Sequence, residues 1–156
     1  MTKLLQELKG HDQWWAWAQN LLTVVTLVLA PISARESFDA QIVGGAALYL
    51  AGAIVGLLGV RELGRNRSPH PQPLTGSFLV QSGIYLVMRH PLYSSLILVT
   101  FGWAIAWNSV PALLAAVALT ILLDQKARLE ERYLTKRFPE YREYVARVSR
   151  FFPGLY

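Results

Sequence analysis

Long stretches of uncharged, apolar residues alternate with shorter polar segments along the chain. The first apolar stretch runs from Trp14 to Ile32 and begins with a cluster of tryptophans, which favour the headgroup level of a membrane. The second runs from Ile42 to Val60. As helices rising 1.5 Å per residue, both have about the length needed to cross roughly 30 Å of hydrocarbon. The pattern therefore predicts two transmembrane helices in the N-terminal half.

A third apolar region, Leu92 to Leu123, is too long for one span and is interrupted at its middle by a polar segment that contains Pro111. Polar residues followed by proline are typical of a turn. The region therefore predicts a helical hairpin made of residues 91–107 and 110 to about 128. The expected fold is all-α, an integral-membrane bundle of about four transmembrane helices.

Glycines recur along the second predicted helix. Gly45, Gly52, Gly56 and Gly59 follow one another at seven-, four- and three-residue spacing. Small residues at such intervals allow another helix to approach closely. The spacing favours helix packing over a role in ligand binding.

A polar connector, Arg61 to Arg89, separates the second and third apolar regions and contains Pro69, Pro71 and Pro73. Prolines and glycines break any continuous helix there. Loops of this length without an evident helix or strand pattern are uncommon in compact proteins and are often functional. The connector is therefore a candidate part of a functional site.

The composition agrees with a membrane protein built as one domain. Of 156 residues, 53% are hydrophobic and 16% charged, which is too apolar for an ordinary soluble domain. The chain has no cysteine, which excludes disulfides, thiolate metal sites and a cysteine nucleophile. With three scattered histidines in addition, no metal site is expected.

The positions of the basic residues predict the orientation in the membrane. Fourteen of the fifteen lysines and arginines fall on one side of the predicted spans, and Arg35 alone falls on the other. Cytoplasmic segments carry such an excess, so both termini and the connector are expected in the cytoplasm. The charged stretch Arg128 to Arg150 predicts a C-terminal cytoplasmic amphipathic helical segment with a break at Pro139. Because basic residues flank apolar segments, anionic lipids are the expected counter-charge and nucleic acid is not.

Candidate chemistry lies at both ends of the predicted hairpin. Arg89, His90 and Tyr93 stand where the third helix begins, and a helix start offers free N–H groups to a carboxylate. Lys126 and Glu130, four residues apart, share one face of the fourth helix. The hairpin places these groups across one cleft under the connector. Two plainer interpretations remain open, namely interfacial anchoring at the first end and a simple salt bridge at the second.

These segments together resemble a known enzyme family. The motif Arg89-His90-Pro91-Leu92-Tyr93, the apolar hairpin, Glu130-Glu131 and Phe138-Pro139-Glu140-Tyr141-Arg142-Glu143-Tyr144 resemble the isoprenylcysteine carboxyl methyltransferase and phospholipid methyltransferase group. Leu79-Val80 and Gly83-Ile84-Tyr85 extend the resemblance, which covers about residues 75–153. Two positions depart from the family pattern. Ser95 stands where glycine is usual, and Lys126 stands where eukaryotic protein-methylating members would present arginine.

The resemblance implies an S-adenosylmethionine-dependent methyltransferase. Residues 75–156 would form the cofactor-binding and catalytic half, and residues 1–74 a two-span scaffold with the connector. In chemical terms His90, Tyr93 and the helix start suit the methionine carboxylate, Glu130 the ammonium, and Tyr85 the adenine. The implied cofactor pocket consists of Leu79, Val80, Tyr85, His90, Pro91, Leu92, Tyr93 and Glu130.

The methyl acceptor is expected to be a lipophilic molecule, an isoprenoid or a lipid, that enters from the bilayer of a prokaryotic cell membrane. Arg89 and Lys126 are the candidates for orienting an acidic group on it. Two alternatives remain open at this point. One is a membrane reductase that is related to the sterol reductases and uses NADPH, and the other is a non-enzymatic lipid-binding scaffold. Cofactor binding separates the three hypotheses, because the methyltransferase should bind S-adenosylhomocysteine, the reductase a dinucleotide and the scaffold neither.

Overall fold

The structure is a computed structural model that describes residues 2–36, 38–68, 71–73 and 76–154, with side chains from Gln13 onward. Pro69 of the predicted connector lies outside these residues. The described part is helical and holds no named strand, which confirms the all-α expectation. Its elements are α1 (Thr2–Ile32), α2 (Asp39–Leu63), η1 (Gly64–Asn66), η2 (Gly83–Leu86), α3 (Pro91–Ala106), α4 (Val110–Arg137) and α5 (Tyr141–Arg147).

Three segments of the described chain are long and apolar enough to cross a membrane. They are Gln13–Ile32 of α1, Asp39–Asn66 over α2 and η1, and Val110–Arg137 of α4. Helix α3 is also apolar, but its 16 residues extend only about 24 Å, less than the roughly 30 Å of the hydrocarbon core. Three of the four predicted spans are thus long enough, and the fourth is a shorter apolar helix.

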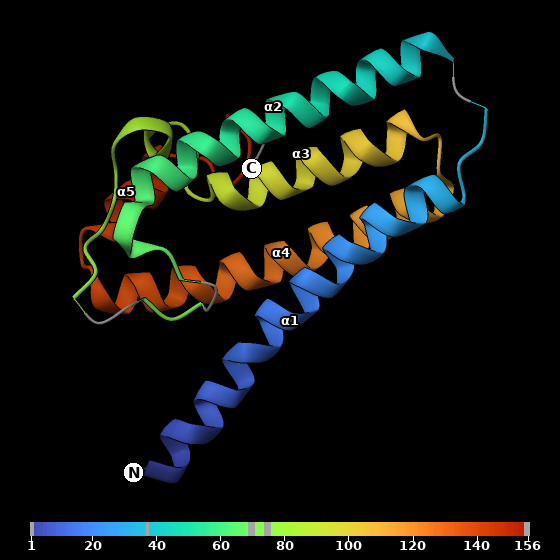
Figure 1. Cartoon of the computed structure of the whole chain (residues 1–156). Helices are drawn as coiled ribbons and strands as arrows, with labels where there is room; N and C mark the ends of the chain where they lie inside the picture. The colour runs from blue at the N-terminus through green and yellow to red at the C-terminus, as the bar shows by residue number, and fades with distance from the viewer. Residues whose placement is uncertain (1, 37, 69–70, 74–75, 155–156) are drawn as a thin grey trace.

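The helices form a bundle (Figure 1), and the end that holds the charged connector and the charged part of α4 is called the polar end below. Helix α2 packs mainly on α3, and α1 crosses α4. The end of α1, the start of α2 and the turn between α3 and α4 gather at one end of the bundle. The other end holds the connector, the start of α3, the end of α4 and α5. Segments that are distant in the sequence therefore meet at this second end.

Glycines bring α2 and α3 into close backbone contact, as their spacing predicted. A Cβ atom on Gly45 would lie 2.5 Å from the backbone nitrogen of Ala106 and 2.6 Å from the carbonyl oxygen of Gly102. A Cβ atom on Gly56 would lie 2.5 Å from the hydroxyl oxygen of Ser95. Gly56 thus leaves room for the serine that stands where the family pattern has glycine.

Gly45→Ala is expected to destabilise the protein by about 1–3 kcal/mol, because the added methyl group would push two helix backbones apart. The neighbouring Gly44 is the matched control, since a Cβ atom there would meet no atom within 4 Å. Unfolding both variants in mixed micelles with increasing sodium dodecyl sulfate measures the difference. Equal stabilities would show that close packing at Gly45 contributes nothing.

A tight turn joins α3 to α4, as predicted. Asn108 has a positive φ of 48°. The side chain of Ser109 accepts a hydrogen bond from the N–H of Ala112 and so caps α4.

Helix α4 continues to Arg137, well past the predicted span end near residue 128. No glycine or proline occurs between Ala112 and Arg137, and charged side chains alone do not end a helix. The predicted break at Pro139 is present between α4 and α5.

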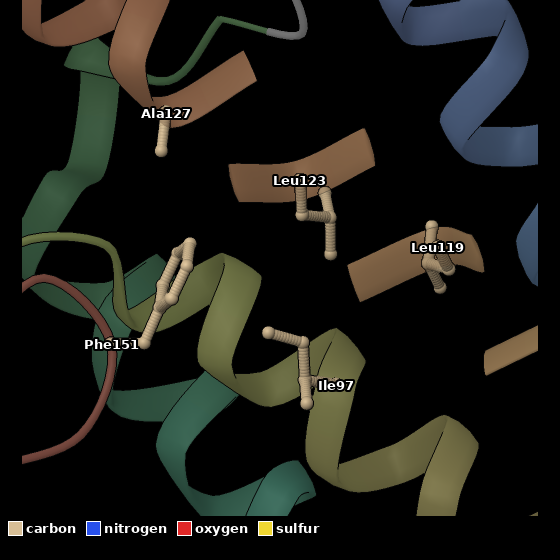
Figure 2. Close-up of a cluster of buried hydrophobic side chains, with 5 residues drawn as sticks. All are labelled: Ile97, Leu119, Leu123, Ala127 and Phe151. Atoms are coloured by element: carbon tan, nitrogen blue, oxygen red, sulfur yellow. The ribbon is translucent and has the colours of Figure 1, made fainter. Parts of the chain in front are cut away.

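The C-terminal segment returns to the hairpin and completes its core. Ile97 of α3 packs with three residues of α4 and with Phe151, which follows α5 (Figure 2). The carbonyl oxygen of Phe151 also accepts a hydrogen bond of 2.8 Å from the hydroxyl of Ser94. The α4 residues in this cluster are Leu119, Leu123 and Ala127.

Candidate active site

A pocket lies at the polar end of the bundle, between the connector, η2, the start of α3, the end of α4 and α5. Its empty space amounts to about 820 Å³, part of which is open to solvent. Arg89 and seven of the eight residues predicted for the cofactor pocket line it. The seven are Leu79, Val80, Tyr85, His90, Leu92, Tyr93 and Glu130. Pro91 is the eighth, a buried residue at the first position of α3 outside the pocket lining.

Glu130 is held in place but keeps part of its carboxylate open to the pocket. The hydroxyl of Tyr93 donates a hydrogen bond of 2.9 Å to Glu130 Oε2. The ring of His90 stacks on that of Tyr93, with 5.3 Å between the centroids, and its Nδ1 lies 3.7 Å from the same oxygen. The Glu130 side chain remains 29% exposed. Glu130 therefore has acceptor capacity left for a positively charged ligand.

Glu131 has the opposite role and is the centre of a buried ion-pair network. Its carboxylate lies 2.9 Å from Arg89 Nη2, 2.9 Å from Arg150 Nη2 and 3.2 Å from His90 Nε2. Arg89 also donates to the carbonyl oxygens of Val145 and Val148. Glu131 thus ties the start of α3 to α4 and to the C-terminal segment.

Further bonds fix the C-terminal segment against the walls of the pocket. The N–H groups of Arg89 and His90 donate to the carbonyl oxygens of Ser149 and Arg150. The hydroxyl of Tyr144 in α5 donates a hydrogen bond of 2.5 Å to the carbonyl oxygen of Tyr85 in η2. Burial raises the pKa of Tyr144 to about 12, so its hydroxyl remains a donor. These bonds therefore hold η2, the start of α3, α5 and the C-terminal segment together around the pocket.

Comparison with known sequences decides the family to which this site belongs. The family pattern described as phospholipid methyltransferase matches residues 40–141, from the start of α2 to the first residue of α5. The chain belongs to the phospholipid methyltransferase family. The family match includes α2, which the resemblance from sequence motifs did not cover.

Two curated proteins share part of their sequence with this family member. The cobalt-zinc-cadmium resistance protein CzcN of Cupriavidus metallidurans is 42% identical over 79 residues, 49% of this chain and 36% of that protein. The nickel-cobalt-cadmium resistance protein NccN of Alcaligenes xylosoxydans is 28% identical over 138 residues, 86% of this chain and 62% of that protein. The chain thus spans between about a third and three fifths of these relatives. Their names give no support to a reductase or a lipid scaffold.

Lys126, a departure from the family pattern, lies outside the pocket lining. The residue is only 2% exposed. Its ammonium donates a hydrogen bond of 2.7 Å to Gln19 Oε1 of α1 and lies 5.3 Å from the centre of the Tyr93 ring. Its polar partner is therefore Gln19. The alternative interpretation, a salt bridge with Glu130, was wrong, because α4 turns the ammonium toward α1.

Several pocket residues were not predicted from the sequence of this phospholipid methyltransferase family member. The segment from Phe138 to Tyr144 belonged to the motifs that carry the resemblance, but no role was assigned to it. The connector contributes small polar groups for which only its length gave a signal. The pocket residues that were missed are Leu63, Asn66, Ser68, Gln72, Pro73, Ser77, Phe78, Leu134, Phe138, Tyr141 and Tyr144.

The chemistry of the pocket fits a nucleoside joined to an amino acid. One side presents the open carboxylate of Glu130, and aromatic and aliphatic side chains form much of the remaining wall. Ser77 Oγ and Tyr141 Oη are buried and have no hydrogen-bond partner among the described residues. Unsatisfied polar atoms are rare in protein interiors, and in a pocket they mark positions for a ligand. In the described part of the chain, no group of three or more histidines and acidic residues could hold a metal ion.

Proposed function

We propose that the protein is an integral-membrane methyltransferase that uses S-adenosylmethionine and methylates a lipophilic acceptor at the cytoplasmic face of the membrane. The observation that carries the proposal is the pocket itself. In a chain of the phospholipid methyltransferase family, it joins seven residues implied as cofactor ligands around the open carboxylate of Glu130. S-adenosylmethionine carries an ammonium and a sulfonium, and it supplies an activated methyl group when it is bound.

The side chains of the pocket would bind and align the cofactor. Glu130, held by Tyr93, would accept hydrogen bonds from the ammonium of its amino-acid half. Tyr85, Leu79 and Val80 offer an aromatic ring and aliphatic carbons for the flat face of the adenine. Burial raises the pKa of Tyr85 well above 10, so its hydroxyl stays neutral. Because transfer of a methyl group from a sulfonium is an in-line displacement, alignment and exclusion of water are the main tasks of the protein.

The acceptor would reach the pocket from the bilayer. Helix α3 is too short to cross a membrane of usual thickness, and the pocket lies at its N-terminal end beside α4. The fourteen basic residues on that side support a cytoplasmic location for the site and for both termini. The bacterial origin of the two relatives supports a prokaryotic cell membrane. Lys126 stays our proposed partner for an acidic group of the acceptor, and to reach it the acceptor would have to displace Gln19 from its ammonium.

Membranes that contain the protein should transfer a labelled methyl group from S-adenosylmethionine to a molecule that partitions into organic solvent. If the acceptor carries an acidic group, Lys126→Ala should lower the rate of this methyl transfer about tenfold or more, while the affinity for S-adenosylhomocysteine changes little. Lys126→Arg should retain part of the turnover, since the charge persists in a different geometry.

Gln19→Leu is the matched control, because it removes the partner of Lys126 but leaves the cation. If Lys126 serves only to hold α1 on α4, both substitutions should lower stability and turnover to the same degree. That result would remove Lys126 from the acceptor site.

The proposed reaction itself would be contradicted if no labelled methyl group appeared in the lipid extract when bacterial lipids and isoprenoids are supplied.

A further inference from the structure

Most donors near the start of α3, where the sequence suggested a site for the carboxylate of the cofactor, are already engaged within the protein. The N–H of His90 donates to the carbonyl oxygen of Arg150, and the N–H of Tyr93 donates to that of His90. The Tyr93 hydroxyl donates to Glu130. The guanidinium of Arg89 is bound to Glu131 and to carbonyl oxygens of the C-terminal segment. A carboxylate in this pocket would therefore gain from a further donor beyond the N–H of Leu92.

Tyr141 provides a buried hydroxyl without a partner. It is the first residue of α5, it is only 1% exposed, and it borders the pocket. Its ring packs edge-on against that of Tyr144, with 5.7 Å between the centroids. Tyr144 is itself fixed by its bond to Tyr85. The Tyr141 ring is thus held in place although its hydroxyl has no bond to any residue that the structure describes.

The surroundings of Tyr141 make it a donor at the charged side of the pocket. Burial and the nearby charge of Glu131 raise the pKa of the Tyr141 phenol well above its usual value near 10. The phenol therefore keeps its proton.

We propose that Tyr141 is a ligand-binding residue whose hydroxyl donates a hydrogen bond to the carboxylate of the amino-acid half of S-adenosylmethionine. The inference rests on the proposed function. Glu130 would take the ammonium on the same carbon atom, so the two residues together would recognise both charges of the amino acid. The same pairing would give the buried hydroxyl the partner that it lacks in the described part of the chain.

The test compares two ligands on the detergent-purified full chain. S-adenosylhomocysteine carries the amino-acid half, and 5′-methylthioadenosine has the same nucleoside without it. Tyr141→Phe should weaken S-adenosylhomocysteine binding about tenfold and leave 5′-methylthioadenosine binding unchanged. The melting temperature of the ligand-free variant should not fall, because the hydroxyl removed has no bond in the described structure. Tyr133→Phe, on α4 outside the pocket lining, should change neither affinity.

Three results would overturn the assignment of Tyr141. They are an unchanged affinity for S-adenosylhomocysteine, an equal loss for both ligands, and a clearly lowered melting temperature, which would give the hydroxyl a structural role. Failure of the unaltered protein to bind S-adenosylhomocysteine would instead contradict the proposed function, and the inference with it.

Discussion

Glu131→Gln is expected to destabilise the protein by about 3–5 kcal/mol, the range found when one partner of a buried ion pair is removed. The substitution would leave Arg89 and Arg150 without their shared carboxylate in a largely buried place, where the side chain of Glu131 is 13% exposed. It would also loosen the C-terminal segment from α3 and α4. Unfolding in mixed micelles with increasing sodium dodecyl sulfate measures the loss.

Glu130→Gln is the matched control for that experiment. Glu130 precedes Glu131 on the same helix, and its carboxylate is bound by the neutral hydroxyl of Tyr93, which an amide oxygen can also accept. Its stability should therefore fall by much less than that of Glu131→Gln. Equal stability of the two variants would contradict the division of roles between the adjacent glutamates.

Glu130→Gln should have its main effect on cofactor binding. Loss of a hydrogen bond to a charged group costs about 1.5–3 kcal/mol, or roughly ten- to a hundredfold in affinity for S-adenosylhomocysteine. The affinity for 5′-methylthioadenosine, which has no ammonium, should stay the same. Calorimetry of both ligands with this variant measures the contrast. An unchanged affinity for S-adenosylhomocysteine would place the ammonium away from Glu130.

Much of the fold could be predicted because it depends on local signals. Asn108 and Ser109 supply turn chemistry wherever they stand in an apolar stretch, and Gly45 marks a close helix contact through its spacing. The convergence of His90 and Glu130 also follows from the sequence, because a hairpin brings the start of one helix to the end of the next. These features depend only on the spacing of residues along a helix and on the antiparallel course of the two helices in a hairpin.

The remaining features depend on how the helices are rotated and crossed. Successive residues on a helix point about 100° apart, and only the family resemblance, not the helix pattern, singled out Glu130 for the pocket. That Glu131 faces Arg150 was not predicted. Gln19 meets Lys126 from 107 positions away because α1 crosses α4. The segment that contains Phe151 has no periodic pattern, and its return to α3 is stabilised by tertiary contacts.

The central claim is that the pocket binds S-adenosylmethionine, and calorimetry of the detergent-purified protein tests it most directly. Titration with S-adenosylhomocysteine should show saturable binding of one molecule per chain, and titration with NADPH under the same conditions should show none. Binding of NADPH without binding of S-adenosylhomocysteine, or binding of neither, would contradict the account.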